Sequence, residues 1–326
     1  MVSPPRRFLD RIKSIEERLL LITNPMSRKG SEIASRIRSM VRREGLFLEE
    51  TSTDHPDDVG STLEFWSKRF GGSRVIMVFG GDGAVNQIVN NVMLSRSNKN
   101  VVLVPFPGGT ANDFCGALGL DTVEKTIEAM ISFNVKPIDL IRIEVEQGNG
   151  TRLMKYCSNI IGLGIDGDIA NLSQKYRRFG VPGYWYAALK KTAKLLLSEP
   201  ESYLVKIKTP MLDYCGHIIG AMFSNIEKYG QNLRIAPGAK PDDGKIYMTV
   251  AKPMSTLRAF IAGLLMLKGK HTKMPGVDGY VCESANVEIL DDIYAQEDGE
   301  VRFYPRGTFL DLSLEKQAIN VLYLPQ

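Results

Sequence analysis

Residues that bind transition metals or form disulfides are scarce in this sequence. Four cysteines and three histidines lie far apart in 326 residues, with no CxxC pair and no HExxH segment. This excludes a zinc knuckle, a local redox pair and the usual type of zinc hydrolase. The isolated cysteines indicate a reducing, cytoplasmic setting. Metal chemistry would therefore depend on carboxylates, which are suited to Mg²⁺.

Long apolar runs and a large charge excess are absent as well. The longest apolar run, at 259–267, is far shorter than the roughly 18 residues that indicate a membrane-spanning helix. Residues 1–17 mix basic and acidic side chains without a signal-peptide pattern and are interpreted as an N-terminal extension. The formal net charge of +4 is too small to favour nucleic acid, and 44% hydrophobic residues exclude a disordered chain.

Strand and helix signals alternate between residues 18 and 136. Apolar runs predict buried parallel strands, and apolar residues at helical spacing predict helices between them. The expected strands are 18–23, 46–51, 74–79 and 101–105, and the expected helices are 31–43, 57–70, 85–93 and 123–133. This order predicts an α/β fold, with a doubly wound, Rossmann-like nucleotide domain at the N-terminus.

Residues 137–326 have a different pattern, with shorter strands that alternate between apolar and polar side chains. It predicts an antiparallel β-sandwich-like domain, with helical segments at 168–198 and 254–268. The expected strands are 138–145, 152–160, 203–208, 216–223, 246–250, 287–290 and 301–304. A last strand at 318–324 could belong to either domain.

Two of the predicted strands, 74–79 and 101–105, are each followed by a glycine-rich loop. These loops are Gly80–Gly83 and Pro107–Phe114. Turning and capping would explain either loop alone. The carboxyl ends of parallel strands share one edge of a sheet, so we expect both loops, with the loop at 24–30, to meet in one crevice. Their backbone N–H groups suit phosphate, and the carboxylate of Asp82 indicates a metal or a proton transfer. This edge is predicted to be a nucleotide phosphate site.

With these motifs the chain resembles the diacylglycerol kinase catalytic-domain family of lipid kinases, which includes bacterial soluble diacylglycerol kinases and sphingosine kinases. The resemblance covers nearly the whole chain. It depends on NPxS at 24–27, GGDG at 80–83, PxGTxNDF at 107–114, GLGID at 162–166, PGAKPDDG at 237–244 and DGE at 298–300. GGDG alone is shared with NAD kinases and phosphofructokinases, whereas the later motifs are specific to lipid kinases.

The resemblance implies roles for individual residues. Glu300 matches the proton acceptor that activates the lipid hydroxyl, and Asp82 and Asp113 match acids around the catalytic Mg²⁺. A further, structural Mg²⁺ would be held by the side chain of Asp243 and the main-chain oxygens of Lys240 and Lys245. The positions that match ATP-binding residues are Asn24, Pro25, Met26, Ser27, Arg28, Thr53, Gly81, Asp82, Gly83, Ala84, Val85, Asn86, Gln87 and Thr110.

Two positions depart from the family pattern. Ala84 replaces the usual threonine of GGDGT and removes a hydroxyl near the phosphates, and Gln87 stands where glutamate is common. Either change is expected to weaken nucleotide binding or to alter the metal preference. They leave open a catalytically silent protein that binds lipid or nucleotide.

Residues 162–167 match GxGxxG literally, as in dinucleotide-binding proteins. The ribose-binding acid expected about 20 residues further on is missing, because 169–198 contains no Asp or Glu. We interpret these glycines as a tight turn that packs closely against the nucleotide domain.

Two acid-free stretches carry many of the cations. Residues 172–198 contain six Lys or Arg with five aromatic residues, and residues 251–277 contain five Lys or Arg around the apolar run. The rest of the chain then has a formal charge of −7. Such stretches suit an anionic membrane surface, and they equally suit amphipathic helices that cover the β domain with solvated cations outside.

The sequence thus favours an ATP- and Mg²⁺-dependent lipid kinase that phosphorylates the hydroxyl of a diacylglycerol-like or long-chain-base lipid. It would act in the cytoplasm, peripherally on a membrane surface, without a nucleic acid partner; the oligomeric state, a homodimer included, is left open. One alternative is a NAD kinase-like enzyme, against which PxGTxNDF argues. The other is the silent binding protein.

Overall fold

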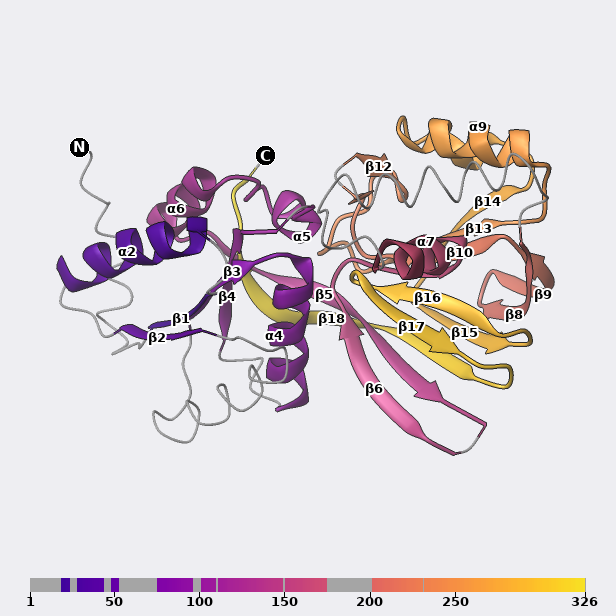
Figure 1. Cartoon of the computed structure of the whole chain (residues 1–326), viewed down its shortest axis with the longest axis horizontal. Coiled ribbons are helices and arrows are strands. Elements are labelled where there is room, and N and C mark those ends of the chain that lie inside the picture. Colours follow the sequence, from indigo (N-terminus) through magenta and orange to yellow (C-terminus); the bar gives the residue numbers. More distant parts are fainter. Residues whose placement is uncertain are drawn as a thin grey trace. The chain divides into compact units, whose positions relative to one another are not determined.

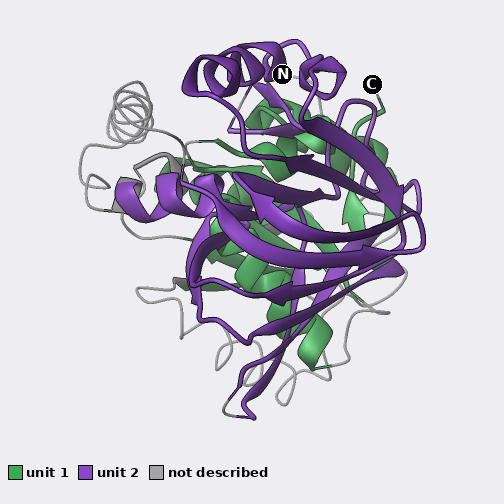
Figure 2. Ribbon diagram, turned by 90° about the vertical axis from the view of Figure 1, so that its right-hand side faces the viewer, with its two compact units in different colours: residues 1–138, 317–326 green, residues 139–316 purple. Residues whose placement is uncertain are grey.

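The computed structural model of the chain describes residues 19–23, 28–43, 48–52, 75–95, 101–109, 111–148, 150–174, 201–230 and 232–325. The chain divides into two compact units. Unit 1 comprises residues 1–138 and 317–326, and unit 2 comprises residues 139–316 (Figure 2). Among the described residues, no helix has both the length and the apolarity needed to cross a membrane.

Unit 1 contains a parallel sheet in the order β2-β1-β3-β4-β18. Its strands are β1 (Leu19–Thr23), β2 (Leu48–Ser52), β3 (Val75–Gly80), β4 (Val102–Pro107) and the end of β18 (Phe309–Leu322). All residues of β1 and β3 are buried, which explains why their apolar runs are continuous. Neighbouring strands pair in parallel, so their carboxyl ends lie at the same edge of the sheet.

The helices in the described part of unit 1 are α2 (Arg28–Arg43), α4 (Asp82–Leu94), α5 (Asp113–Ala117) and α6 (Val123–Ser132). Helix α2 connects β1 to β2, and α4 connects β3 to β4 in the opposite direction along the sheet. Right-handed crossovers therefore place α2 and α4 on opposite faces, as in a doubly wound fold (Figure 1). Helix α5 is too short to show an apolar period and was not predicted, and the helix expected at 57–70 lies outside the described residues.

Unit 2 consists mainly of two sheets. The first has β5 paired with β6 and with β18, and continues from β18 through β15 and β8 to β9. The second has the order β14-β13-β10-β7-β16-β17, with antiparallel neighbours throughout. The strands are β5 (Val135–Glu146), β6 (Arg152–Cys157), β7 (Ile160–Gly164), β8 (Tyr203–Thr209), β9 (Leu212–Ile218), β10 (Gly220–Ser224), β13 (Ile246–Ala251), β14 (Val277–Cys282), β15 (Ser284–Ile289), β16 (Ile293–Glu297) and β17 (Glu300–Tyr304).

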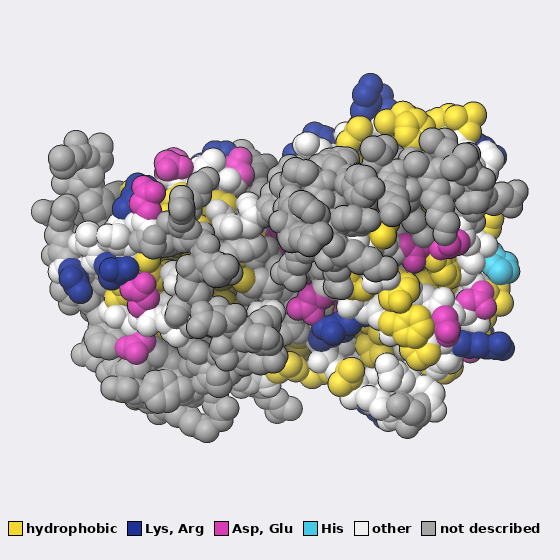
Figure 3. Space-filling model, in the orientation of Figure 1, with side chains coloured by type: hydrophobic (Ala, Val, Ile, Leu, Met, Phe, Trp, Pro, Cys, Tyr) yellow, Lys and Arg dark blue, Asp and Glu magenta, His cyan; other side chains and the backbone are white. Residues whose placement is uncertain are grey.

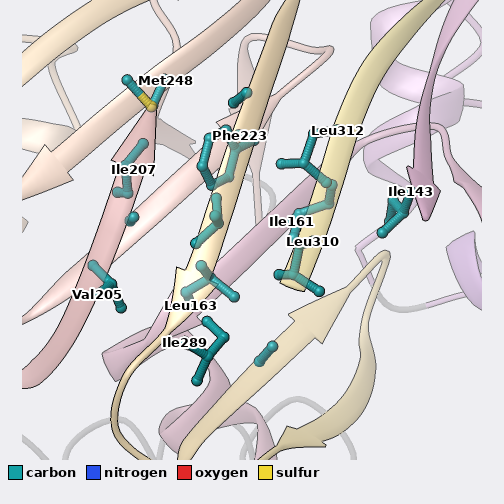
Figure 4. Packing of buried hydrophobic residues seen from close by; sticks show 14 of the residues in the cluster. Ile143, Ile161, Leu163, Val205, Ile207, Phe223, Met248, Ile289, Leu310 and Leu312 are labelled. Atoms are coloured by element: carbon teal, nitrogen blue, oxygen red, sulfur yellow. The ribbon is translucent and has the colours of Figure 1, made fainter. Parts of the chain in front are cut away.

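The two sheets of unit 2 enclose one hydrophobic core. Val205 and Leu310 from the first sheet and Leu163, Phe223 and Met248 from the second belong to the same buried cluster (Figure 4). Alternate residues of β8 are buried and exposed, as expected for strands with one face in a core. The predicted fold class, an α/β nucleotide domain followed by a β-sandwich-like domain, is confirmed.

The chain changes sheets at two places where the sequence predicts one continuous strand. The strand expected at 152–160 is β6 of the first sheet followed, after Ser158 and Asn159, by β7 of the second. The strand expected at 216–223 is likewise divided at Ile219 into β9 and β10. Both segments stay buried on crossing the core, so their apolar pattern does not show the break.

Among the residues of unit 2 that the structure describes, three helices accompany the sheets: α7 (Ile165–Gln174), α9 (Thr256–Met266) and the 3-10 helix η3 (His271–Lys273). Helix α7 packs on β16 and β7. The helix predicted at 168–198 is thus partly found, and its residues after 174 lie outside the described part. The short strands β11 (Lys228–Tyr229) and β12 (Leu233–Arg234) pair only with each other.

The glycines of the GxGxxG segment form the junction between β7 and α7. Gly164 has a φ of +78°, and a Cβ atom at Gly162 would lie 1.9 Å from Oδ2 of Asp166. A Cβ at Gly167 would lie 2.2 Å from the carbonyl oxygen of Tyr294. The atoms that these Cβ positions would meet belong to unit 2 itself, so packing within that unit is enough to require the tight turn.

Asp166 provides a test of this packing. Burial raises the pKa of its carboxyl from 3.8 to about 6, an effect that the Gln296 side chain partly offsets. The folded chain then holds this proton more tightly than the unfolded chain, so stability falls as the pH rises from about 4 to about 6. Asp166→Asn cannot titrate. Its free energy of unfolding, relative to the wild type, should rise by about 2 kcal/mol between pH 4 and pH 7 in urea unfolding; parallel pH profiles would contradict the packing.

Candidate active site

The two glycine-rich loops of unit 1 are in direct backbone contact. The N–H of Gly108 donates to the carbonyl of Gly80 at 3.0 Å. A Cβ atom at Gly109 would lie 2.4 Å from the Cα atom of Gly81, so a side chain there would separate the loops. The glycines are thus required for the close approach of the two loops at the carboxyl edge of the sheet, whatever they bind.

The carboxylate of Asp82 connects the first loop to the second. Its Oδ1 accepts the N–H of Phe114 at 2.9 Å, and its Oδ2 accepts the N–H of Asp113 at 3.2 Å. Asn112, at a φ of +55°, closes the same turn because its Oδ1 accepts the N–H of Gly109 at 2.7 Å. Asp82 and Asp113, predicted to act together, are therefore held side by side.

This arrangement has the groups that a phosphate and a metal ion need. The N-terminal turn of α4 offers backbone N–H groups to an anion, and Asp82 is the first residue of that helix. A carboxylate has more acceptor positions than the two bonds to Asp113 and Phe114 use, so Asp82 can also coordinate Mg²⁺. Burial, and then the charge of Asp82, raise the pKa of the Cys115 thiol, which argues against a nucleophilic thiolate there.

Only part of the predicted ATP-binding set falls within the described residues. Arg28 begins α2, and the segment from Gly81 to Gln87 forms the start of α4. The side chain of Asn86 accepts a hydrogen bond from Nδ2 of Asn90 at 2.7 Å. The positions outside the described residues are Asn24, Pro25, Met26, Ser27, Thr53 and Thr110.

Glu300 lies in unit 2, at the first position of β17. A two-residue turn connects β16 to β17, in which Glu297 pairs with Glu300. Asp298 and Gly299 have φ values of +48° and +86°, the positive values of a type I′ hairpin turn, for which Asp-Gly is a preferred sequence. The first two residues of the DGE motif therefore form the turn, and the third is presented at its end.

Asp298 anchors this turn to the crossing between the two sheets. Its carboxylate accepts the N–H groups of Ser158, Asn159 and Ile160 at 2.6, 2.9 and 3.0 Å. It also accepts the hydroxyl of Ser158 and the thiol of Cys157, both at 2.8 Å. Sequence reasoning treated Asp298 as part of a motif and missed this role; the only local signal was its Asp-Gly turn.

The carboxylate of Glu300 is partly exposed and contacts Arg302. Nη2 of Arg302 donates to Oε2 of Glu300 at 2.5 Å. The neighbouring acid, Glu297, is buried and forms hydrogen bonds with Lys155 and Tyr304. Glu300 is therefore the acid of this hairpin whose carboxylate reaches the surface.

The third predicted group, around Asp243, forms a compact loop before β13. Oδ2 of Asp243 accepts the hydroxyl of Tyr247 at 2.9 Å and the N–H of Lys240 at 3.2 Å. Burial, and then this contact, raise the pKa of Tyr247 to about 12. Oδ1 of Asp243 is buried and has no hydrogen-bond partner among the described residues.

The environment of Asp243 fits a cation. A buried carboxylate oxygen without a hydrogen-bond partner is a favourable ligand for a cation, and the carbonyls of Lys240 and Lys245 are close in sequence. In the described part of the chain, no cluster of three or more His, Cys, Asp or Glu side chains could hold a metal ion. A site here would therefore combine one carboxylate with main-chain oxygens, the donor set expected from the sequence.

Together, a doubly wound unit with two touching glycine-rich loops and a following β sandwich are features of a phosphotransferase that uses a nucleotide. Residues 18–143 match the family described as diacylglycerol kinase catalytic domain. Residues 159–322 match the family described as YegS C-terminal NAD kinase beta sandwich-like domain. The chain belongs to the family that combines these two domains, which makes it an ATP-dependent lipid kinase in class.

Relatives and solved structures agree with this assignment. A diacylglycerol kinase of Mycobacterium tuberculosis is 25% identical over 85% of this chain and 87% of its own length. A diacylglycerol kinase of Staphylococcus carnosus is 23% identical over 96% of both chains. A crystal structure from Bacillus anthracis covers 95% of this chain and 98% of its own, with a TM-score of 0.72 and 22% identity, and so shares the fold. The resemblance drawn from the sequence is confirmed.

The anchoring role of Asp298 predicts a large effect on stability. Asp298→Ala would leave at least three buried backbone N–H groups without an acceptor. The free energy of unfolding should fall by about 3 kcal/mol or more in urea denaturation. The control is Asp311→Ala, at an exposed position of β18, which should change stability by no more than about 0.5 kcal/mol. Equal stabilities of the two variants would show that the anchor is unimportant.

Proposed function

We propose that this kinase transfers the γ-phosphate of ATP to the hydroxyl of a diacylglycerol-like or long-chain-base lipid. The observation that carries the proposal is the carboxylate of Asp82, which joins two touching glycine-rich loops at the carboxyl edge of a parallel sheet. Phosphates and Mg²⁺ need such a combination of backbone donors and a fixed acid. That the acceptor is a lipid is inferred from the relatives, which are named diacylglycerol kinases.

We assign ATP binding to residues 18–136 and lipid binding to residues 137–326. The loops at 24–30, 80–87 and 107–114 are assigned to the nucleotide, and so is Thr53. Asp82 and Asp113 hold the catalytic Mg²⁺, which supplies charge neutralisation at the transferred phosphate. The contacts of Asp82 with α5 support this role, because they fix the carboxylate before a ligand arrives.

Glu300 is the proposed general base. Its carboxylate takes the proton of the lipid hydroxyl as the alcohol oxygen bonds to the γ-phosphorus and the bond to the β-phosphate oxygen breaks, which leaves ADP. The type I′ turn and the Asp298 anchor restrict where this carboxylate can lie, and Arg302 limits its rotation. Glu300 therefore needs little reorganisation to accept the proton.

We propose that the lipid is met at a membrane surface by a cytoplasmic, peripherally bound enzyme. Diacylglycerols and long-chain bases partition into bilayers, so the enzyme has to work at that interface. Ala84 and Gln87 remain the positions where this chain is expected to bind ATP less tightly than its relatives.

Replacing Glu300 by Gln tests the base. Phosphate transfer should fall by at least about 100-fold, because general-base catalysis contributes about 10²–10⁴ in rate. The Kd for ATP should change little, since Glu300 lies outside the loops assigned to the nucleotide. Lipid phosphorylation from radiolabelled ATP and equilibrium binding of ATP measure the two quantities. Glu315→Gln, on the exposed side of β18, is the matched control.

The same assay separates the alternatives. Labelled product from NAD but not from a lipid extract would identify a NAD kinase-like enzyme. ATP binding without any labelled lipid would identify a silent binding protein. Loss of ATP binding in Glu300→Gln would contradict the role given to Glu300.

The loop around Asp243 is proposed to hold a structural Mg²⁺, with Lys240 and Lys245 contributing carbonyl oxygens. Saturating Mg²⁺ should then stabilise the wild type by roughly 3 kcal/mol at about 100 times the Kd. Asp243→Asn should lose most of this stabilisation in thermal unfolding with and without Mg²⁺. Asp213→Asn, on the exposed side of β9, should keep it; equal Mg²⁺ effects in the two variants would rule the site out.

A further inference from the structure

Helix α9 carries its large apolar side chains on the outside of unit 2. Leu257, Phe260, Ile261, Leu264 and Leu267 are between 40% and 64% exposed. Ala262 is the buried residue of the helix, and Ala259 and Met266 are half-buried. The helix thus packs through Ala259, Ala262, Leu265 and Met266 and leaves most of its large apolar side chains exposed, which is the reverse of an ordinary surface helix.

The exposed residues form one continuous face. Positions 257, 260, 261, 264 and 267 follow the i, i+3, i+4, i+7 spacing of a single helix stripe, and we call them the α9 face. Figure 3 shows hydrophobic side chains gathered where α9 lies in Figure 1. Contiguous apolar surface of this kind marks a site of contact with a protein or a membrane.

Basic residues surround the α9 face. Arg258, Lys268, Lys270 and Lys273 are exposed, and the segment 251–277 contains no acid. Nη2 of Arg258 donates to the carbonyl of Pro275 at 2.9 Å, which fixes this cation beside the face. We call these four residues the basic border. The α9 face with its basic border is therefore complementary to a partner that has an apolar interior and an anionic surface.

The helix is firmly attached to unit 2. Met266 packs against a buried cluster of Ile160, Ile235, Ala236 and Ala239. The next turn is held by the N–H of Lys270, which donates to the carbonyl of Leu265 at 2.9 Å. His271 is fully buried, and its Nε2 donates to the carbonyl of Ile235 at 3.1 Å. The outward direction of the α9 face is thus set by packing on the opposite side.

We propose that the α9 face inserts into the surface of an anionic lipid bilayer, with its basic border at the headgroups. Amphipathic helices bind bilayers in this way, and each cation near an anionic surface strengthens the attachment. A second copy of the chain is disfavoured as the occupant, because a symmetric contact would bring the same cations together. The inference rests on the proposed function, since it names the surface through which the kinase reaches its lipid.

Co-sedimentation with vesicles, without ATP, tests the proposal. The full chain should bind vesicles rich in phosphatidylglycerol. The double variant Phe260→Gln, Leu264→Gln should bind them at least about tenfold more weakly, because two side chains lose their insertion into the acyl region. The matched control replaces two other exposed apolar residues of unit 2, Met211→Gln in the turn between β8 and β9 and Phe309→Gln at the start of β18, and should bind as the wild type does.

The basic border predicts a separate result. Lys268→Gln, Lys270→Gln should weaken binding to phosphatidylglycerol vesicles by about fivefold per cation at low salt. The loss should disappear on vesicles of phosphatidylcholine alone, where there is no anionic charge. A salt titration of the wild type should show the same weakening.

Unchanged vesicle binding in the Phe260, Leu264 variant would overturn the inference. So would a concentration-dependent dimer that this variant abolishes, because a second copy would then cover the face. Circular dichroism of each variant checks that the fold is retained, as expected for exposed positions. Because binding is measured without phosphate transfer, a failure here is distinguishable from a failure of the proposed kinase activity, which would appear as unlabelled lipid with normal vesicle binding.

Discussion

The carboxylate of Asp298 is the constraint on which most of unit 2 depends. It accepts three consecutive backbone N–H groups at the place where the chain leaves the first sheet and enters the second. The same residue turns β16 into β17 at a positive φ. One buried acid thus joins the crossing of the sandwich to the hairpin that presents Glu300. The carboxylate of Glu300 reaches solvent, but its position is thus set by Asp298, which is buried in the core.

Unit 1 uses a carboxylate in a comparable way. Asp82 accepts the N–H groups of Asp113 and Phe114 and so holds two loops together, which also positions the acids assigned to Mg²⁺. The glycines around it permit the approach that these bonds require, since a side chain at Gly109 would collide with Gly81. In both units a motif that is assigned to the reaction, GGDG in unit 1 and DGE in unit 2, also holds parts of the fold together. Loss of activity in a variant of either motif therefore needs a stability measurement beside it.

Much of the fold could be predicted from periodicity. The buried strands β1, β3 and β4 have apolar runs that a parallel sheet requires, and helix α9 was expected within two residues of its observed ends. The two sheet crossings were missed because a segment that stays buried while changing sheets has the same pattern as one long strand. Helix α5 was missed because five residues show no period, and it owes its ordered N-terminus to Asp82, 31 residues earlier.

The candidate site was predictable to the extent that its residues lie in short motifs. Asp82 was chosen from its glycine-rich loop, whereas Asp113, Asp243 and Glu300 were implied by the family resemblance, and the family itself is confirmed. The partners that hold these acids were not predictable, because Phe114, Tyr247 and Arg302 are ordinary residues whose contacts depend on the folded chain. The unpartnered oxygen of Asp243 could likewise be recognised only in three dimensions.

The sequence by itself determined the order of elements and the family, and it named the acids that we propose for the site, because these depend on residue type and spacing along the chain. It also showed that 251–277 is basic and apolar without any acid. Only the tertiary structure decided which side of α9 faces the core. Ala259, Ala262, Leu265 and Met266 lie on the inner side, so Leu257, Phe260, Ile261 and Leu264 are left outside. Spacing places residues on a common face of a helix, but the shape of the surface beneath selects which face is buried.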